Sequence, residues 1–193
     1  MASEPLRVVC YVNQFFGQIG GEEKAGIGPQ VMNGAVGAAR AVQQALGDGG
    51  TVVATVNCGD NYAVEQGERA VAELLTLVAA ARPDLVIAGP AFLAGRYGVA
   101  CGALCVAVQA QLGIPAVTGM QPENPGVDLY RRRVYVVQTA RHGAQRRCHV
   151  VRVPRNDGPI SAPHRPPQGL CQRPVRRWIS ASPGDPARSG PAH

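Results

Sequence analysis

The stretch LRVVCYVN (Leu6–Asn13) decides the fold, because it is short, rich in β-branched residues and followed by a glycine-rich segment. Four later runs share this character: residues 51–59, 84–92, 114–120 and 133–139. Near-continuous apolar runs of this length are typical of strands that are buried on both faces, as in a parallel sheet. The sequence therefore predicts about five strands in a mostly parallel sheet.

Three stretches between these strands carry apolar residues at helical spacing: residues 31–46, 63–82 and 97–112. We expect the first to end at Gly47, and the second to be capped by Asp60 or Asn61 and to end before Pro83. Single helices between strands imply right-handed crossovers. The predicted fold is therefore α/β, with a doubly wound sheet of the Rossmann or flavodoxin-like type.

Charge divides the chain into two unlike parts. Residues 1–140 contain nine Lys+Arg and eleven Asp+Glu, a net charge of −2, whereas residues 141–193 contain ten Arg against two Asp, a net charge of +8. The overall charge of +6 therefore comes entirely from the second part. We expect residues 1–140 to form the α/β domain and residues 141–193 to form a basic tail.

The tail is rich in Pro and Arg and poor in large apolar residues, so it cannot bury enough area to offset the entropy of ordering. Three interpretations stay open: a disordered tail, an out-of-frame translation of a GC-rich gene, and an arginine-rich arm that binds nucleic acid. The α/β part has no basic surplus and gives no sign of nucleic-acid binding.

No apolar run approaches the roughly 20 residues of a membrane-spanning helix, and the first residues, MASEPLR, lack the features of a signal peptide. We therefore expect a cytoplasmic protein that does not bind membranes. Its six cysteines are then expected to be reduced rather than paired in disulfides.

Ligands of parallel α/β sheets bind beyond the carboxyl ends of the strands. Polar, glycine-rich segments follow four of the predicted strands: residues 13–24, 58–62, 89–97 and 119–128. Neither a dinucleotide fingerprint nor a P-loop is present, so no bound cofactor is expected in this chain. The predicted substrate-binding side chains are Asn13, Gln14, Glu22, Glu23, Asn61, Arg96, Tyr97 and Asn124.

Three of these side chains suggest specific chemistry. Arg96 lies just before a helix start, where a guanidinium and free N–H groups attract a carboxylate or phosphate. The alternative is an arginine that pairs with a local carboxylate such as Asp60. Glu22 and Glu23 could bind an ammonium group or act as a base, or form a solvated acidic turn.

The cysteines allow several roles. Cys101 and Cys105 share one face of a helix. They could form a redox pair, provide two metal ligands or be buried thiols. No histidine occurs in residues 1–140, so no metal site is expected. Cys58, at a strand end, is the candidate catalytic residue, because a neighbouring helix start would lower the pKa of its thiol. Cys10 is expected in the core.

Four segments together resemble selenoprotein B of the glycine, sarcosine, betaine and D-proline reductase family. They are YVNQFFGQIGGEEK (11–24), CGDNY (58–62), IAGPAFLAGRYGVACGALC (87–105) and GIPAVTGMQPENPGVD (113–128). The resemblance covers about residues 6–139, the amino-terminal part of a longer subunit.

The resemblance implies an oxidoreductase that cleaves the C–N bond of a small amino acid or N-methylated amine. In that family a selenocysteine attacks carbon, the amine leaves, and a selenoether passes to a selenoprotein A-like carrier. A pyruvoyl group belongs to a partner subunit.

The family's selenocysteine, or the cysteine that replaces it, lies in the later part of the subunit, beyond the matching residues. No residue of this chain can be matched to that nucleophile. We therefore expect a truncated reductase subunit that is inactive alone. The alternative is a non-redox α/β module that binds a small carboxylate or a phosphorylated ligand.

Overall fold

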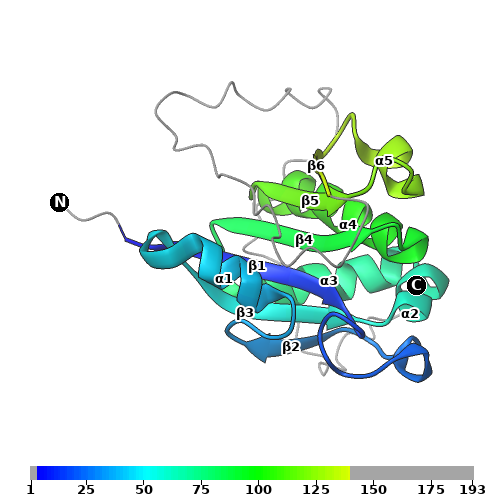
Figure 1. The fold of residues 1–193 in the computed structure, drawn as a ribbon, viewed down its shortest axis with the longest axis horizontal. Helices are drawn as coiled ribbons and strands as arrows, with labels where there is room; N and C mark the ends of the chain where they lie inside the picture. Colours follow the sequence, from blue (N-terminus) through cyan, green and yellow to red (C-terminus); the bar gives the residue numbers. More distant parts are fainter. Residues whose placement is uncertain (1–3, 140–193) are drawn as a thin grey trace, which may run out of the picture. The chain divides into compact units, whose positions relative to one another are not determined.

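A six-stranded sheet runs through residues 4–139, the part of the chain that this computed structural model describes (Figure 1). Its order is β2-β3-β1-β4-β5-β6, and all neighbours are parallel except β2 and β3. The strands are β1 (Leu6–Asn13), β2 (Gln30–Asn33), β3 (Gly50–Cys58), β4 (Leu85–Phe92), β5 (Ala116–Met120) and β6 (Tyr135–Gln138). The predicted α/β class is confirmed, with one strand more than expected.

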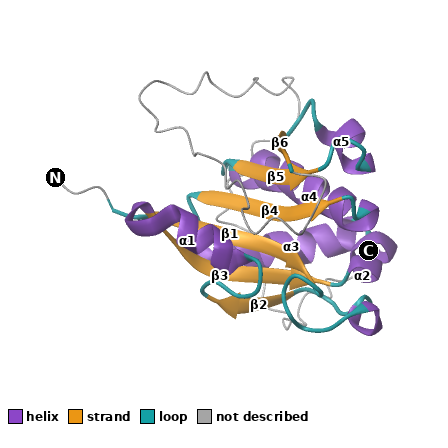
Figure 2. Cartoon of the chain, in the orientation of Figure 1, coloured by secondary structure: helices purple, strands orange, loops and turns teal. Residues whose placement is uncertain are grey.

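Helices cover both faces of the sheet (Figure 2). One face carries α1 (Ala39–Leu46), and the other carries α3 (Glu68–Ala81) and α4 (Gly95–Ala107). Two shorter helices are α2 (Asp60–Gln66) and α5 (Pro125–Tyr130). Single 3-10 turns cover Glu22–Lys24 and Gly47–Gly49, and a π-helical turn, Val108–Leu112, extends α4. Within residues 4–139, no helix is both long and apolar enough to cross a bilayer.

Strand β1 lies at the centre of the sheet because its side chains are apolar on both faces. Val9 and Tyr11 belong to the large core cluster under α3 and α4. Val8 and Cys10 belong to a smaller cluster under α1, and Cys10 is therefore in the core as predicted. The five parallel strands follow the flavodoxin-like order, in which the crossovers reverse direction between β1 and β4.

The helix predicted over residues 31–46 is wrong in its first half. Residues Gln30–Asn33 form the antiparallel edge strand β2, and α1 begins only at Ala39. Gly34 and Gly37 lie between them with φ of 70° and 56°, backbone conformations that interrupt a helix. Gly47 ends α1 with φ 53°, as the sequence predicted.

The helix predicted over residues 63–82 is two helices, which are separated by Gly67 with φ 48°. Helix α2 already starts at Asp60, and neither Asp60 nor Asn61 caps it, because Gly59 occupies the N-cap position. The end is as predicted: Arg82 adopts the left-handed conformation and Pro83 follows.

The third predicted helix is present as α4 and its π-helical extension, and Gly113 follows it with φ 68°. Helix α5 was not predicted. It begins at Pro125, and the Asn124 side chain caps it by accepting a hydrogen bond from Gly126 N at 2.9 Å. The predictions for the tail, residues 141–193, lie outside the described residues.

Candidate functional site

Segments that follow β1, β3 and β4 meet at the carboxyl end of the sheet, next to the point where the crossovers reverse direction. Three side-chain contacts join them: Asn13 to Asp60, Arg96 to Asn61, and Arg96 to Glu22. The segment after β5 joins as well, because Asn124 donates to backbone oxygens next to β4. The four predicted segments therefore do converge on one edge.

The buried part of this edge is a small amide and carboxylate cluster. Asn13 Nδ2 donates to Asp60 Oδ2 at 3.0 Å, and the Asp60 amide donates to Gln14 Oε1 at 3.0 Å. Asn13 and Gln14 are almost fully buried, and Asp60 is 8% exposed. These contacts fix the Asp60 carboxyl group directly beyond the end of β3.

The surroundings of Asp60 disfavour the charged form of its carboxyl group. Burial raises its pKa, against the opposing effects of the Asn13 hydrogen bond and of the nearby Arg96 charge. Its second oxygen, Oδ1, is buried and has no hydrogen-bond partner in the described structure. An unpaired buried acceptor of this kind is costly for stability and is typical of functional sites. Sequence reasoning had considered Asp60 only as a helix cap or as a partner of Arg96.

The start of α2 is closed by the loop that follows β1. The amides of Asn61 and Tyr62 both donate to Ala25 O, at 2.9 and 3.1 Å. A Cβ at Gly59 would lie 2.2 Å from the same oxygen, so only glycine permits this approach. Because these N–H groups are already used, the start of α2 is a poor site for an anion.

Arg96, the second residue of α4, is the cation of the edge. Its Nη2 donates to Glu22 Oε1 at 2.8 Å, and its Nη1 donates to Asn61 Oδ1. Arg96 is half exposed and Glu22 is 71% exposed. An exposed ion pair of this kind contributes at most about 1 kcal/mol, so a ligand carboxylate can take the place of Glu22 beside Arg96.

Glu23, the other predicted acid, accepts from Gly21 N at 2.9 Å within its own turn. This hydrogen bond lowers the pKa of its exposed carboxyl group. The geometry corresponds to the solvated acidic turn that the sequence left open. A role in binding stays a prediction for Glu23.

Tyr97 and Asn124 stabilise the backbone at the carboxyl edge through side-chain hydrogen bonds. Tyr97 is fully buried, and its hydroxyl donates to Tyr11 O at 3.3 Å. Asn124 Nδ2 donates to Phe92 O and Ala94 O at 3.0 and 3.1 Å, while its Oδ1 caps α5. These bonds position the turn that carries Arg96, and direct ligand contact stays a prediction for both residues.

The cysteines of residues 4–139 are all buried and free. The expected lowering of the Cys58 pKa is wrong, because burial raises the pKa of this thiol to about 12. Burial also raises the pKa of Cys105 to about 12 and that of Cys101 well above its usual value. None of these thiols is readily ionised, and within residues 4–139 no group of three or more His, Cys, Asp or Glu could hold a metal ion.

The edge therefore offers a half-exposed guanidinium beside two carboxylates, one exposed and one buried. Such a pair of opposite charges matches the two ends of a small zwitterion. It provides no activated nucleophile among the described residues.

Comparison with known proteins identifies the family of the chain. Residues 5–155 match the family model "Glycine/sarcosine/betaine reductase selenoprotein B". The chain belongs to this family. No solved structure matches the chain.

Three relatives represent the three named reductases. The chain is 54% identical over 145 residues to a glycine reductase complex component B subunit gamma of Symbiobacterium thermophilum, over 75% of this chain and 34% of that protein. It is 53% identical over 142 residues to a sarcosine reductase complex component B subunit beta of Peptoclostridium acidaminophilum, over 74% and 33%. It is 44% identical over 131 residues to a betaine reductase complex component B subunit beta of the same organism, over 68% and 30%. The chain thus spans about a third of the length of these relatives.

Proposed function

We propose that the chain forms the amino-terminal, substrate-side α/β part of a B-type subunit of a glycine, sarcosine or betaine reductase. The relatives named above, which are 44–54% identical to the chain, support this assignment. The observation that carries it is the convergence of Arg96, Glu22 and Asp60 at the carboxyl edge of the sheet. The proposal also includes D-proline as a substrate, which rests on the resemblance alone.

In this proposal Arg96 binds the substrate carboxylate. Its guanidinium is already oriented by Asn61 and Glu22, so little side-chain entropy is lost when a second carboxylate replaces the exposed Glu22. The ammonium end of the substrate then faces the released Glu22 carboxylate.

We further propose that residues 4–139 do not catalyse C–N cleavage alone. The support is the state of their four cysteines, which are buried with raised pKa values and therefore resist forming a thiolate. The nucleophile, the pyruvoyl subunit and the selenoprotein A-like carrier would then belong to other parts of the complex.

The test of Arg96 is calorimetry with glycine, sarcosine and betaine on the full chain. Arg96→Ala should weaken binding by about 1.5–3 kcal/mol, the cost of losing a charge-assisted hydrogen bond. Arg40→Ala, an exposed arginine on α1, is the matched control and should leave the affinity unchanged. Equal affinities of Arg96→Ala and the unmodified chain would remove Arg96 from the site.

A second candidate is a non-redox module that binds a small carboxylate or a phosphorylated ligand. The burial of all four described thiols favours it, because binding at Arg96 requires no thiol. One experiment separates the reductase role from the binding module. The accessible thiols of the chain are alkylated, and the rest of a B-type subunit is then added together with its partners. Substrate-dependent release of the amine in that mixture supports the reductase role, whereas unchanged binding without any release supports the module.

A further inference from the structure

Aromatic rings gather at the carboxyl edge of the sheet, beside the charged side chains of the candidate site. The ring of Phe16 is central, and its centroid lies 5.5 Å from that of Phe15. The rings of Phe92 and Tyr97 each lie 5.8 Å from the ring of Phe16. Core packing accounts for Tyr97, which is fully buried, but not for Phe15, whose exposed fraction is 65%.

Hydrogen bonds and stacking connect these rings to the charged groups. Asn13 Oδ1 accepts from the amide of Phe16 at 2.9 Å, while Asn13 Nδ2 donates to Asp60 Oδ2 at 3.0 Å. Tyr97, whose ring stacks on that of Phe16, directly follows Arg96 in α4. The rings are therefore adjacent to the residues that carry the buried carboxyl group and the guanidinium of the edge.

The backbone at Phe92 has an unfavourable conformation. Its φ of 46° lies in the left-handed region, which bulky side chains rarely adopt. Phe92 O accepts from Gln121 N and from Asn124 Nδ2, both at 3.0 Å, and these bonds hold the turn. Backbone strain of this kind persists where the surrounding structure enforces it, and such positions cluster at ligand sites. The placement of the Phe92 ring beside Phe16 is thus a second indication that the rings serve binding.

Phe15 and Phe16 form a right-angled pair, which we call the aromatic corner. Their planes meet at 86°, and Phe15 is the exposed member. The face of an aromatic ring carries partial negative charge and attracts cations, and sets of rings around a site recognise methylated ammonium groups. The aromatic corner therefore matches a cation that is also apolar.

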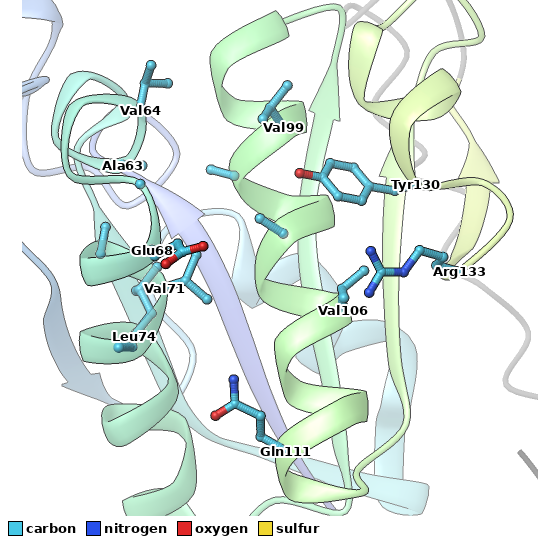
Figure 3. A pocket seen from close by; sticks show the side chains of 15 residues that line it. Ala63, Val64, Glu68, Val71, Leu74, Val99, Val106, Gln111, Tyr130 and Arg133 are labelled. Carbon is cyan, nitrogen blue, oxygen red and sulfur yellow. The ribbon is translucent and has the colours of Figure 1, made fainter. Parts of the chain in front are cut away.

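An apolar groove on the outer side of α4 lacks this combination (Figure 3). Tyr130 is the one aromatic residue among the described residues that line it. Its charged residues, Glu68 and Arg133, stand on opposite walls with α4 between them. The carboxyl edge, by contrast, combines several rings with an acid and a base that touch.

We propose that the aromatic corner binds the N-methyl groups of the substrate, so that the site prefers betaine and sarcosine to glycine. This inference rests on the proposed function, because Arg96 must hold the carboxylate of the same molecule. Each N-methyl group removes an N–H donor that Glu22 could accept and adds apolar surface that a ring face attracts. Phe15 and Phe16 are then the residues that determine specificity.

The first test is calorimetry of the full chain with glycine, sarcosine, betaine and tert-butylacetate, in which carbon replaces the charged nitrogen of betaine. We expect affinity to rise with the number of N-methyl groups, and betaine to bind about fivefold more tightly than tert-butylacetate. Betaine that binds no more tightly than glycine, or no more tightly than tert-butylacetate, overturns the proposal.

Substitution of Phe15 tests the ring itself. Phe15→Leu keeps an apolar side chain but removes the ring face, so it should lose about fivefold more affinity for betaine than for glycine. Phe15→Tyr keeps the ring and should retain the preference. Tyr135→Leu, which alters an aromatic residue of β6 that is 70% exposed, is the matched control and should change neither affinity. A Phe15→Leu variant with the full preference for betaine, or a Phe15→Tyr variant without it, overturns the role of the ring.

Arg96→Ala separates failure of this inference from failure of the proposed function. If binding depends on Arg96 but Phe15→Leu affects glycine and betaine alike, the substrate site stands and the aromatic corner is not part of it. If no substrate binds, or if Arg96→Ala leaves every affinity unchanged, the proposed function fails and this inference fails with it.

Discussion

Asp60 shows how the site departs from what stability alone would favour. Its carboxyl group is almost fully buried, it accepts one hydrogen bond from Asn13, and its second oxygen has no partner in the described structure. A stable core would replace such a group with a neutral one. The presence of a carboxylate near Arg96 supports a role in the proposed site.

Asp60→Asn should therefore raise stability at neutral pH. The folded state raises the pKa of this carboxyl group, so unfolded chains release its proton at lower pH than folded ones. Stability is therefore lost as pH rises above the usual Asp pKa of about 3.9 and the loss levels off beyond the raised pKa. The melting temperature of the Asn variant should be higher than that of the unmodified chain at pH 7, and the two should be equal below about pH 3.5. A lower melting temperature at pH 7 would contradict this reasoning, and Asp48→Asn, an exposed aspartate, is the control.

At the residue scale, the sequence predicted which segments lie at the carboxyl edge of the sheet, but it did not predict which side chains contact each other there. Arg96 and Glu22 are 74 residues apart, and no local pattern indicates that their side chains meet. The pKa of Cys58 could not be predicted either, because its main cause, desolvation, depends on packing from distant elements.

At the element scale the strands were easier to predict than the helix boundaries. Strand β1 was predicted without error because its apolar run is buried on both faces. Strand β2 was missed because QVMN is a short, mostly exposed edge strand whose apolar residues also fit a helix. The break at Gly67 was missed since the φ of an isolated glycine cannot be read from sequence.

The packing of α4 on α5 yields an element-scale prediction. A Cβ at Gly102 would lie 2.0 Å from Cδ2 of Tyr130, at the root of the ring, where the side chain cannot easily yield. Gly102→Ala gains up to about 1 kcal/mol of helix propensity, but the overlap costs about 1–3 kcal/mol. We expect a net loss of stability of about 1–2 kcal/mol in urea unfolding. Gly49→Ala, with no atom within 4 Å of the new Cβ, should be neutral; a stabilised Gly102→Ala would show that Tyr130 moves freely.

At the scale of the whole molecule, the helical layers are unequal. α1 is the one α-helix of residues 4–139 on its face, where it covers Val8, Cys10 and Val52. α3 and α4 cover a much larger core on the opposite face. Tyr135 on β6 is 70% exposed, so the far edge of the sheet is less protected than its centre.

Removing residues 141–193 tests whether the tail contributes to the fold. The composition of residues 141–193 cannot bury enough apolar area to offset the entropy of ordering, so we expect the melting temperature of the shortened chain to stay nearly unchanged. The measurement is thermal unfolding by circular dichroism at equal protein concentration. A fall of several degrees would show that the tail packs on the sheet.

The central position of β1 also governs the order of events when the chain is made. β1 is synthesised first, yet its two neighbours are β3, starting at Gly50, and β4, starting at Leu85. After the end of β1 at Asn13, the ribosome must therefore release a further 79 residues, to the end of β4 at Phe92, before β1 is paired along both edges. Such long-range pairing is slow, and until it is complete an apolar strand remains open to pairing with other chains. Nascent-chain protection by a chaperone is thus most valuable early in translation, before β4 has emerged.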